Sequence, residues 1–92
     1  MIAQMNGENE HCPVLNTEYS GHDIHEIDQV PTWQTCWEAC KLTPLCMYWS
    51  WDSKNERACV LKRDYQVAHH KVDYVSGDKS CHQGILKFIR LK

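Results

Sequence analysis

The sequence has no run of about 18 apolar residues, so no segment is expected to span a membrane. Its start, from Met1 to Met5, lacks the basic residues and the apolar core of a signal peptide. No Asn-x-Ser/Thr sequon is present, so N-glycosylation is not expected. The formal net charge is only −2, and the lysines and arginines are spread along the chain. Nucleic acid is therefore not an expected partner.

The short motifs of common catalysts are also missing. The sequence contains no GxSxG nucleophile elbow, no HExxH metal motif and no Cys-x-x-Cys pair for disulfide exchange. A domain of this size also leaves little room for a substrate cleft. We therefore expect a non-enzymatic protein with no catalytic residues and no cofactor.

Cysteine, in contrast, is abundant, with six in 92 residues. A single domain this short buries little apolar surface, and an even number of cysteines at this density is typical of a small secreted domain held by disulfides. A reduced intracellular protein with buried thiols is the alternative. Because no signal peptide precedes the domain, we expect the chain to be one piece of a larger secreted protein.

One short helix is predicted within the stretch from Thr32 to Cys46. Thr32 is a suitable N-cap, and Pro44 ends the helix because it lacks an amide hydrogen. Positions i, i+3, i+4 and i+7 share one helix face. That face carries Trp33, Cys36, Trp37 and Cys40. So short a helix is unstable alone and must pack against another element.

Alternation of apolar and polar residues predicts the strands, and polar stretches predict the turns. We expect strands at 14–15, 23–28, 47–51, 58–62 and 72–75. We expect turns or irregular segments at 16–23, 52–57, 63–70 and 76–79. In the strand 47–51, Met47, Trp49 and Trp51 form the buried side, and this strand makes an antiparallel hairpin with 58–62.

The six cysteines can pair in many ways, and sequence alone does not fix one. Geometry favours a short Cys40–Cys46 loop that attaches the helix end to the first hairpin strand, and a Cys36–Cys59 bridge between helix and sheet. Cys12 and Cys81 then remain to join the two ends of the domain. Structural zinc is the alternative, with Cys36, Cys40, Cys46 and either His69 or His70 as ligands. It is disfavoured because no Cys-x2-Cys pair is present and three cysteines stay unexplained.

Several segments together resemble the PAN/apple domain over roughly residues 12–81. The motifs are YSGHDI at 19–24, the cysteine spacing of 36–46, WSW at 49–51, CVLK at 59–62 and VSGDKSC at 75–81. Asp78 stands where the family usually has proline. The resemblance implies a small disulfide-stapled α+β domain, with one helix packed across a curved antiparallel sheet. It also implies bridges between the first and last, second and fifth, and third and fourth cysteines.

The VSG-x-K-x-C ending is similar to apple domains in the microneme adhesins of apicomplexan parasites. The resemblance therefore implies a secreted adhesion module, one of several apple domains in its chain, that recognises a glycan or a protein on a host cell. Alternative partners are another adhesin or neighbouring apple domains of the same protein. A further alternative is that the domain belongs to a protease zymogen, as apple domains of blood proteases do. Residues 1–11 are expected to be a linker, and residues 82–92 a tail or the start of another segment.

The histidines occur in two pairs, His22 with His25 and His69 with His70. Tyrosine, histidine, lysine and aspartate gather within 64–74, where such side chains could stack on a sugar and hydrogen-bond its hydroxyls. The predicted ligand-binding residues are Tyr65, His69, His70, Lys71, Asp73 and Tyr74. No metal site is expected.

Overall fold

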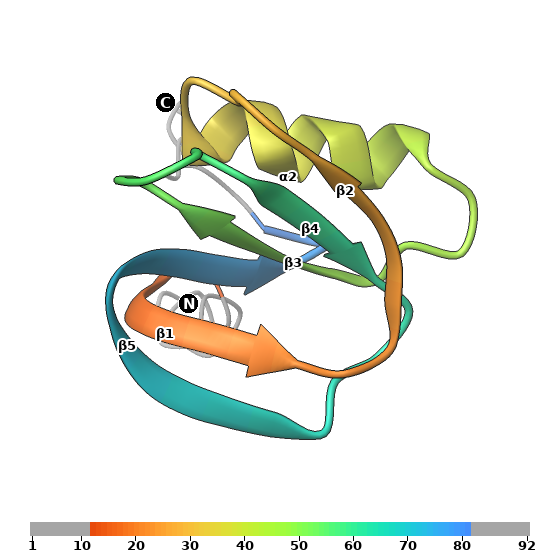
Figure 1. Ribbon diagram of the computed structural model, residues 1–92. Coiled ribbons are helices and arrows are strands. Elements are labelled where there is room, and N and C mark those ends of the chain that lie inside the picture. Colours follow the sequence, from red (N-terminus) through yellow and green to blue (C-terminus); the bar gives the residue numbers. More distant parts are fainter. Residues whose placement is uncertain (1–11, 82–92) are drawn as a thin grey trace, which may run out of the picture.

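The computed structural model describes residues 12–81 (Figure 1). Its elements are β1 (Val14–Ser20), β2 (Asp23–Ile27), α2 (Trp33–Leu42), β3 (Tyr48–Asp52), β4 (Cys59–Lys62) and β5 (Val67–Asp78). The strands form one antiparallel sheet in the order β1-β5-β3-β4-β2, and α2 lies across one face of it (Figure 1). The expected α+β fold is thus confirmed. The predicted linker 1–11 and tail 82–92 lie outside the described residues.

The helix begins and ends as its sequence predicts. The Thr32 hydroxyl accepts a hydrogen bond from the Thr35 amide at 3.1 Å, which satisfies one of the free amides of the first turn. At the other end the Thr43 amide donates to the Cys40 carbonyl, directly before Pro44. Among residues 12–81 no helix is long and apolar enough to cross a membrane.

The hydrophobic core lies between α2 and the sheet. Trp49 and Leu61 are fully buried in it, and the indole rings of Trp33 and Trp49 stack with their centroids 5.6 Å apart. Each core indole nitrogen also has an acceptor: Trp49 donates to the Asp78 carbonyl and Trp51 to the Val30 carbonyl. The buried tryptophans therefore leave no indole N–H unpaired.

Three disulfides cross this core. They join Cys36 to Cys59, Cys40 to Cys46 and Cys12 to Cys81, with Cα–Cα distances of 5.4, 5.3 and 4.8 Å. These are the pairs that the geometry of the sequence favours and the family resemblance implies. The first bridge attaches α2 to β4, the second attaches the end of α2 to the start of β3, and the third joins the two ends of the described region.

Several predicted boundaries are wrong. Residues 16–20 belong to β1 and residues 76–78 to β5, although both were predicted as turns. The irregular segment predicted at 63–70 also contributes its last four residues to β5. Local composition fails here because pairing between distant segments, 14–20 with 67–76, makes these strands. Met47 was assigned to the buried side of β3 but lies before the strand and is half exposed.

Candidate binding surface

The sheet has a second face, which points away from α2. Successive residues of a strand point to opposite faces, so Trp49 and Trp51 on the helix side place Ser50 and Asp52 on the other side. Residues paired across neighbouring strands share a face. The face away from α2 therefore carries, on the three central strands, Tyr48, Ser50, Asp52, Val60, Lys62, Tyr74 and Ser76.

Irregular backbone in both β1 and β5 allows β1 to bend over this face. The register between β1 and β5 shifts between the pair Leu15–Val75 and the pair Thr17–His70. Asn16 and Asp73, within the shifted segments, have φ angles of 54° and 72°, and the Asp73 amide donates to the Asn16 side chain. Such bulges bend a strand and increase its twist. Figure 1 shows β5 curving strongly, with β1 following it.

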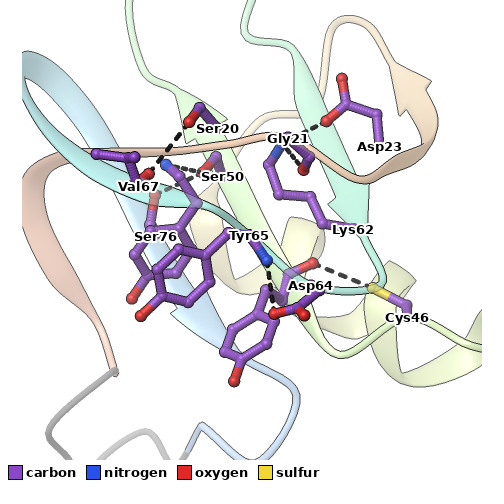
Figure 2. A network of polar contacts seen from close by, with 12 residues as sticks. Ser20, Gly21, Asp23, Cys46, Ser50, Lys62, Asp64, Tyr65, Val67 and Ser76 are labelled. Atoms are coloured by element: carbon purple, nitrogen blue, oxygen red, sulfur yellow. Dashed lines mark hydrogen bonds and ion pairs between the residues drawn. The ribbon is translucent and has the colours of Figure 1, made fainter.

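Hydrogen bonds from two buried serines hold β1 in this position. The Tyr19 amide on β1 donates to the Ser50 hydroxyl on β3 at 2.9 Å, and the Ser50 and Ser76 hydroxyl oxygens lie 2.7 Å apart. The Ser76 hydroxyl donates to the Thr17 carbonyl at 2.7 Å. Figure 2 shows the side chains of Ser50 and Ser76 pointing toward one another. This network satisfies polar groups that would otherwise be buried unpaired.

Three tyrosines pack beside these serines. The rings of Tyr19 and Tyr65 stack with centroids 4.1 Å apart, and Tyr48 meets both rings edge-on. Burial raises the pKa of both Tyr19 and Tyr48, and the neighbouring Tyr65 adds to the effect. The aromatic cluster thus fixes the loop before β5 against the end of β1.

Next to this cluster lies a groove of about 510 Å³, on the face of the sheet away from α2. Side chains of all five strands and of the β3–β4 loop line it. Its charged and aromatic lining residues are Glu18, Asp23, Glu26, Asp52, Glu56, Lys62, Tyr19 and Tyr74. Five carboxylates thus face one lysine across the described part of the lining, so the groove is acidic.

The lysine of the groove is already neutralised. Lys62 is only 3% exposed, and its ammonium forms an ion pair with Asp23 and donates to the Gly21 carbonyl at 3.2 Å. Figure 2 shows the Lys62 side chain reaching both partners at the turn after β1. Glu18 is likewise paired, with the Lys71 ammonium. The carboxylates of Glu26, Asp52 and Glu56 therefore set the electrostatic potential of the groove.

Tyr74 forms part of the groove wall opposite Asp52, its pairing partner on β3. Burial raises the pKa of Tyr74, and the negative charge of Asp52 raises it further. The Lys71 ammonium lies 4.7 Å from the Tyr74 ring centroid and 3.6 Å from the Glu18 carboxylate. The pKa of Lys71 is raised, chiefly by Glu18.

The six residues that the sequence suggests as ligand contacts do not form one cluster. Tyr65, His69 and His70 contribute to a shallow hollow of about 290 Å³ lined by β1 and the start of β5. Tyr74 lines the acidic groove instead, and Lys71 lies beside that groove, in contact with Glu18 and the Tyr74 ring. A ligand-binding role for these residues stays a prediction.

Asp73 is the remaining candidate, and its contacts support the structure of the sheet. Its carbonyl accepts hydrogen bonds from the Ser53 amide and hydroxyl at 2.9 and 2.7 Å, and its carboxylate lies 3.7 Å from the Lys54 ammonium. These contacts attach the bend of β5 to the β3–β4 loop. Asp73 thus supports the end of the groove where Asn55 and Glu56 lie.

Sequence reasoning missed the acidic lining of the groove. The alternation along 49–52 was a usable signal, because the tryptophans define the helix side and so place Asp52 on the other. No local signal placed Glu18 and Glu56 in the same groove, because β1 reaches it only through the bend at Asn16 and Asp73.

Fold, disulfides and groove together define a small disulfide-clamped module that presents one open sheet face. The family model described as the PAN domain matches residues 17–62, and the chain belongs to this family. PAN domains are protein- or carbohydrate-binding modules and are generally non-catalytic. A search of curated proteins finds no match to the sequence.

Proposed function

We propose that this PAN domain is a non-enzymatic adhesion module of a larger secreted protein, and that it binds a host-cell surface partner through the groove. The observation that supports the proposal is the groove itself, of about 510 Å³ and lined from all five strands on the face that α2 leaves open. A concave site with convergent polar groups is the usual form of a binding site.

Rigidity is the physical basis of the proposed binding. Three disulfides and the Ser50–Ser76 network fix the strands that line the groove, so the lining side chains lose little backbone freedom when a partner binds. Binding then needs surface complementarity and no chemical step.

An extracellular setting is consistent with the chemistry of the domain. All cysteines of the described region are paired, and such bridges persist in oxidising compartments. The similarity of residues 75–81 to the apple domains of microneme adhesins supports secretion through that organelle and attachment to a host cell as the specific role.

A second candidate function is docking onto a neighbouring domain of the same protein. The segment after α2 exposes apolar side chains: Leu42 is 82% exposed, Leu45 65% and Met47 48%. Exposed apolar side chains that form a contiguous patch are typical of protein contacts, and these three residues lie close together in sequence. A pull-down with flanking domains, with and without Leu42→Ser and Leu45→Ser, tests this role, which requires capture that the substitutions abolish.

A cell-binding assay tests the main proposal. The fluorescently labelled chain, native or reduced and alkylated, is added to cultured cells that were untreated, protease-treated or glycosidase-treated. We expect saturable binding of the native chain, loss of binding after reduction, and loss after one of the two enzyme treatments. Absence of saturable binding to every cell type of a broad panel would contradict the proposal.

A further inference from the structure

We propose that the groove receives a lysine or arginine side chain of a protein partner, with the Asp52 carboxylate as its buried acceptor. This inference rests on the proposed function and specifies the partner as a basic protein segment. Three independent features support it: an unpaired oxygen at Asp52, an excess of negative charge along the groove, and an internal example of cation binding at Tyr74.

The first feature is the carboxylate of Asp52. Its side chain lines the groove, yet the residue is only 7% exposed. Oδ1 accepts hydrogen bonds from the amides of Lys54 and Asn55, at 2.9 and 3.4 Å. Within residues 12–81, Oδ2 has no hydrogen-bond or ion-pair partner. A carboxylate oxygen without a protein partner, on a residue that lines the groove, is an available acceptor for an incoming cation.

The second feature is the charge around Asp52. Glu26 and Glu56 line the groove, and together with Asp28 they place carboxylate oxygens within 4.8 Å of one another. In the described part of the chain, neither glutamate has a lysine, arginine or histidine within ion-pair distance. Like charges so close repel one another, and a bound cation relieves this repulsion. The groove is therefore complementary to a positively charged group.

The third feature is an intramolecular contact beside the groove, in which the protein's own Lys71 side chain lies against a carboxylate and an aromatic ring. The Lys71 ammonium lies between the Glu18 carboxylate, at 3.6 Å, and the ring of Tyr74, at 4.7 Å from its centroid. This combination of a carboxylate and an aromatic face is a favourable environment for an ammonium or guanidinium group. Asp52 faces Tyr74 across the strands, so it offers an incoming side chain the same chemistry.

The charge of the groove also favours a basic protein segment over a glycan. Sialylated and sulfated glycans are anionic, and the carboxylates would repel them. A neutral sugar would gain hydrogen bonds but nothing from the excess of negative charge. A lysine or arginine side chain gains from both the buried oxygen and the surrounding field.

Peptide titrations test the inference. The probes are a blocked pentapeptide of alternating glycine and arginine, its lysine counterpart, its neutral citrulline counterpart, and methyl β-galactoside. Backbone amide NMR of the isotope-labelled chain locates binding. We expect the two basic peptides to shift the amides around Asp52, Glu26 and Glu56, and the citrulline peptide and the sugar to shift none of them.

Charge-neutralising variants provide the controls. Asp52→Asn keeps the Oδ1 acceptor and should weaken binding of the basic peptides about ten-fold, because the buried charge is lost. The double variant Glu26→Gln, Glu56→Gln changes only exposed residues and should weaken it about five-fold. Glu38→Gln on α2, which changes the net charge as Asp52→Asn does, should have an effect below about two-fold.

Equal weakening by Asp52→Asn and Glu38→Gln would overturn the inference, since binding would then reflect net charge alone. Shifts of the groove amides by methyl β-galactoside but not by the basic peptides would also overturn it, and would identify a glycan site. Cell binding that survives Asp52→Asn would refute the inference while leaving the adhesion proposal intact. A lack of cell binding by the unaltered chain would contradict that proposal.

Discussion

The hydroxyl oxygens of Ser50 and Ser76 lie 2.7 Å apart in the interior, where both residues are at most 1% exposed. Ser50 accepts the Tyr19 amide and Ser76 donates to the Thr17 carbonyl, so the pair connects β3 and β5 to β1. Because β1 contributes Glu18 and Tyr19 to the groove, these two hydroxyl groups determine the shape of the proposed binding surface.

Removal of the Ser76 hydroxyl should destabilise the domain. The variant Ser76→Ala leaves the Thr17 carbonyl without its donor and removes the hydroxyl next to Ser50, which should lower the free energy of unfolding by about 2 kcal/mol. Urea denaturation without reductant measures the change. Ser80→Ala, at an exposed turn residue, is the control and should change it by no more than about 0.5 kcal/mol. Equal effects of the two variants would argue against the network.

The bridge between the ends of the domain should contribute the most stability of the three disulfides. Cys12 and Cys81 are 69 residues apart, whereas Cys40 and Cys46 are 6 apart. In the chain-entropy model, removal of the Cys12–Cys81 bridge by Cys12→Ser and Cys81→Ser costs roughly 4 kcal/mol. Removal of the Cys40–Cys46 bridge by Cys40→Ser and Cys46→Ser costs roughly 2 kcal/mol. Denaturant midpoints compare the two, and a larger loss from the short bridge would contradict the model.

Stability should fall at alkaline pH because of the buried tyrosines. Burial raises the pKa of Tyr19 far above the ordinary tyrosine value of about 10. Above that pH the unfolded chain loses the phenolic proton while the folded chain keeps it, so the free energy of unfolding is intact below pH 10 and decreases above it. Urea denaturation from pH 8 to 11 measures this decrease, which Tyr19→Phe should make shallower. An identical pH dependence in both proteins would contradict the prediction.

Replacement of the buried lysine should strengthen the binding of basic peptides. Lys62→Met removes the one positive charge among the described residues that line the groove, and the exposed Asp23 can then be hydrated. We expect the arginine peptide to bind about two- to five-fold more tightly. Lys41→Met, on α2 and over the ring of Trp37, is the matched control and should change binding little. Weaker binding to Lys62→Met would indicate that Lys62 contacts the ligand directly.

The helix and the first hairpin were predictable because their signals are local. Thr32 and Pro44 bound one helix, and the alternating tryptophans at 49 and 51 identify the buried face of β3. The cysteine spacing, together with the family resemblance, then restricts how helix and hairpin pack. These elements needed no information from distant parts of the chain.

The curved half of the sheet was not predictable by the same means. Residues 67–72 of β5 are exposed and show no apolar alternation, so their strand character comes only from pairing with β1. The groove depends on this pairing, on the bend at Asn16 and Asp73, and on the two buried serines. Hence the sequence suggested residues 65–74 as the ligand site, whereas the acidic lining comes from β1, β2, β3 and the β3–β4 loop.

The position of the binding surface can be tested most directly with glycans as steric blocks. Arg57→Ser creates a sequon at Asn55, on the rim of the groove, and Lys41→Asn creates one two residues before Thr43, on α2. Each variant is secreted from eukaryotic cells in glycosylated form and tested in the cell-binding assay. We predict that the glycan at Asn55 abolishes binding, that its enzymatic removal restores binding, and that the glycan on α2 has no effect. Undiminished binding with the glycan at Asn55 would contradict the assignment of the groove as the binding surface.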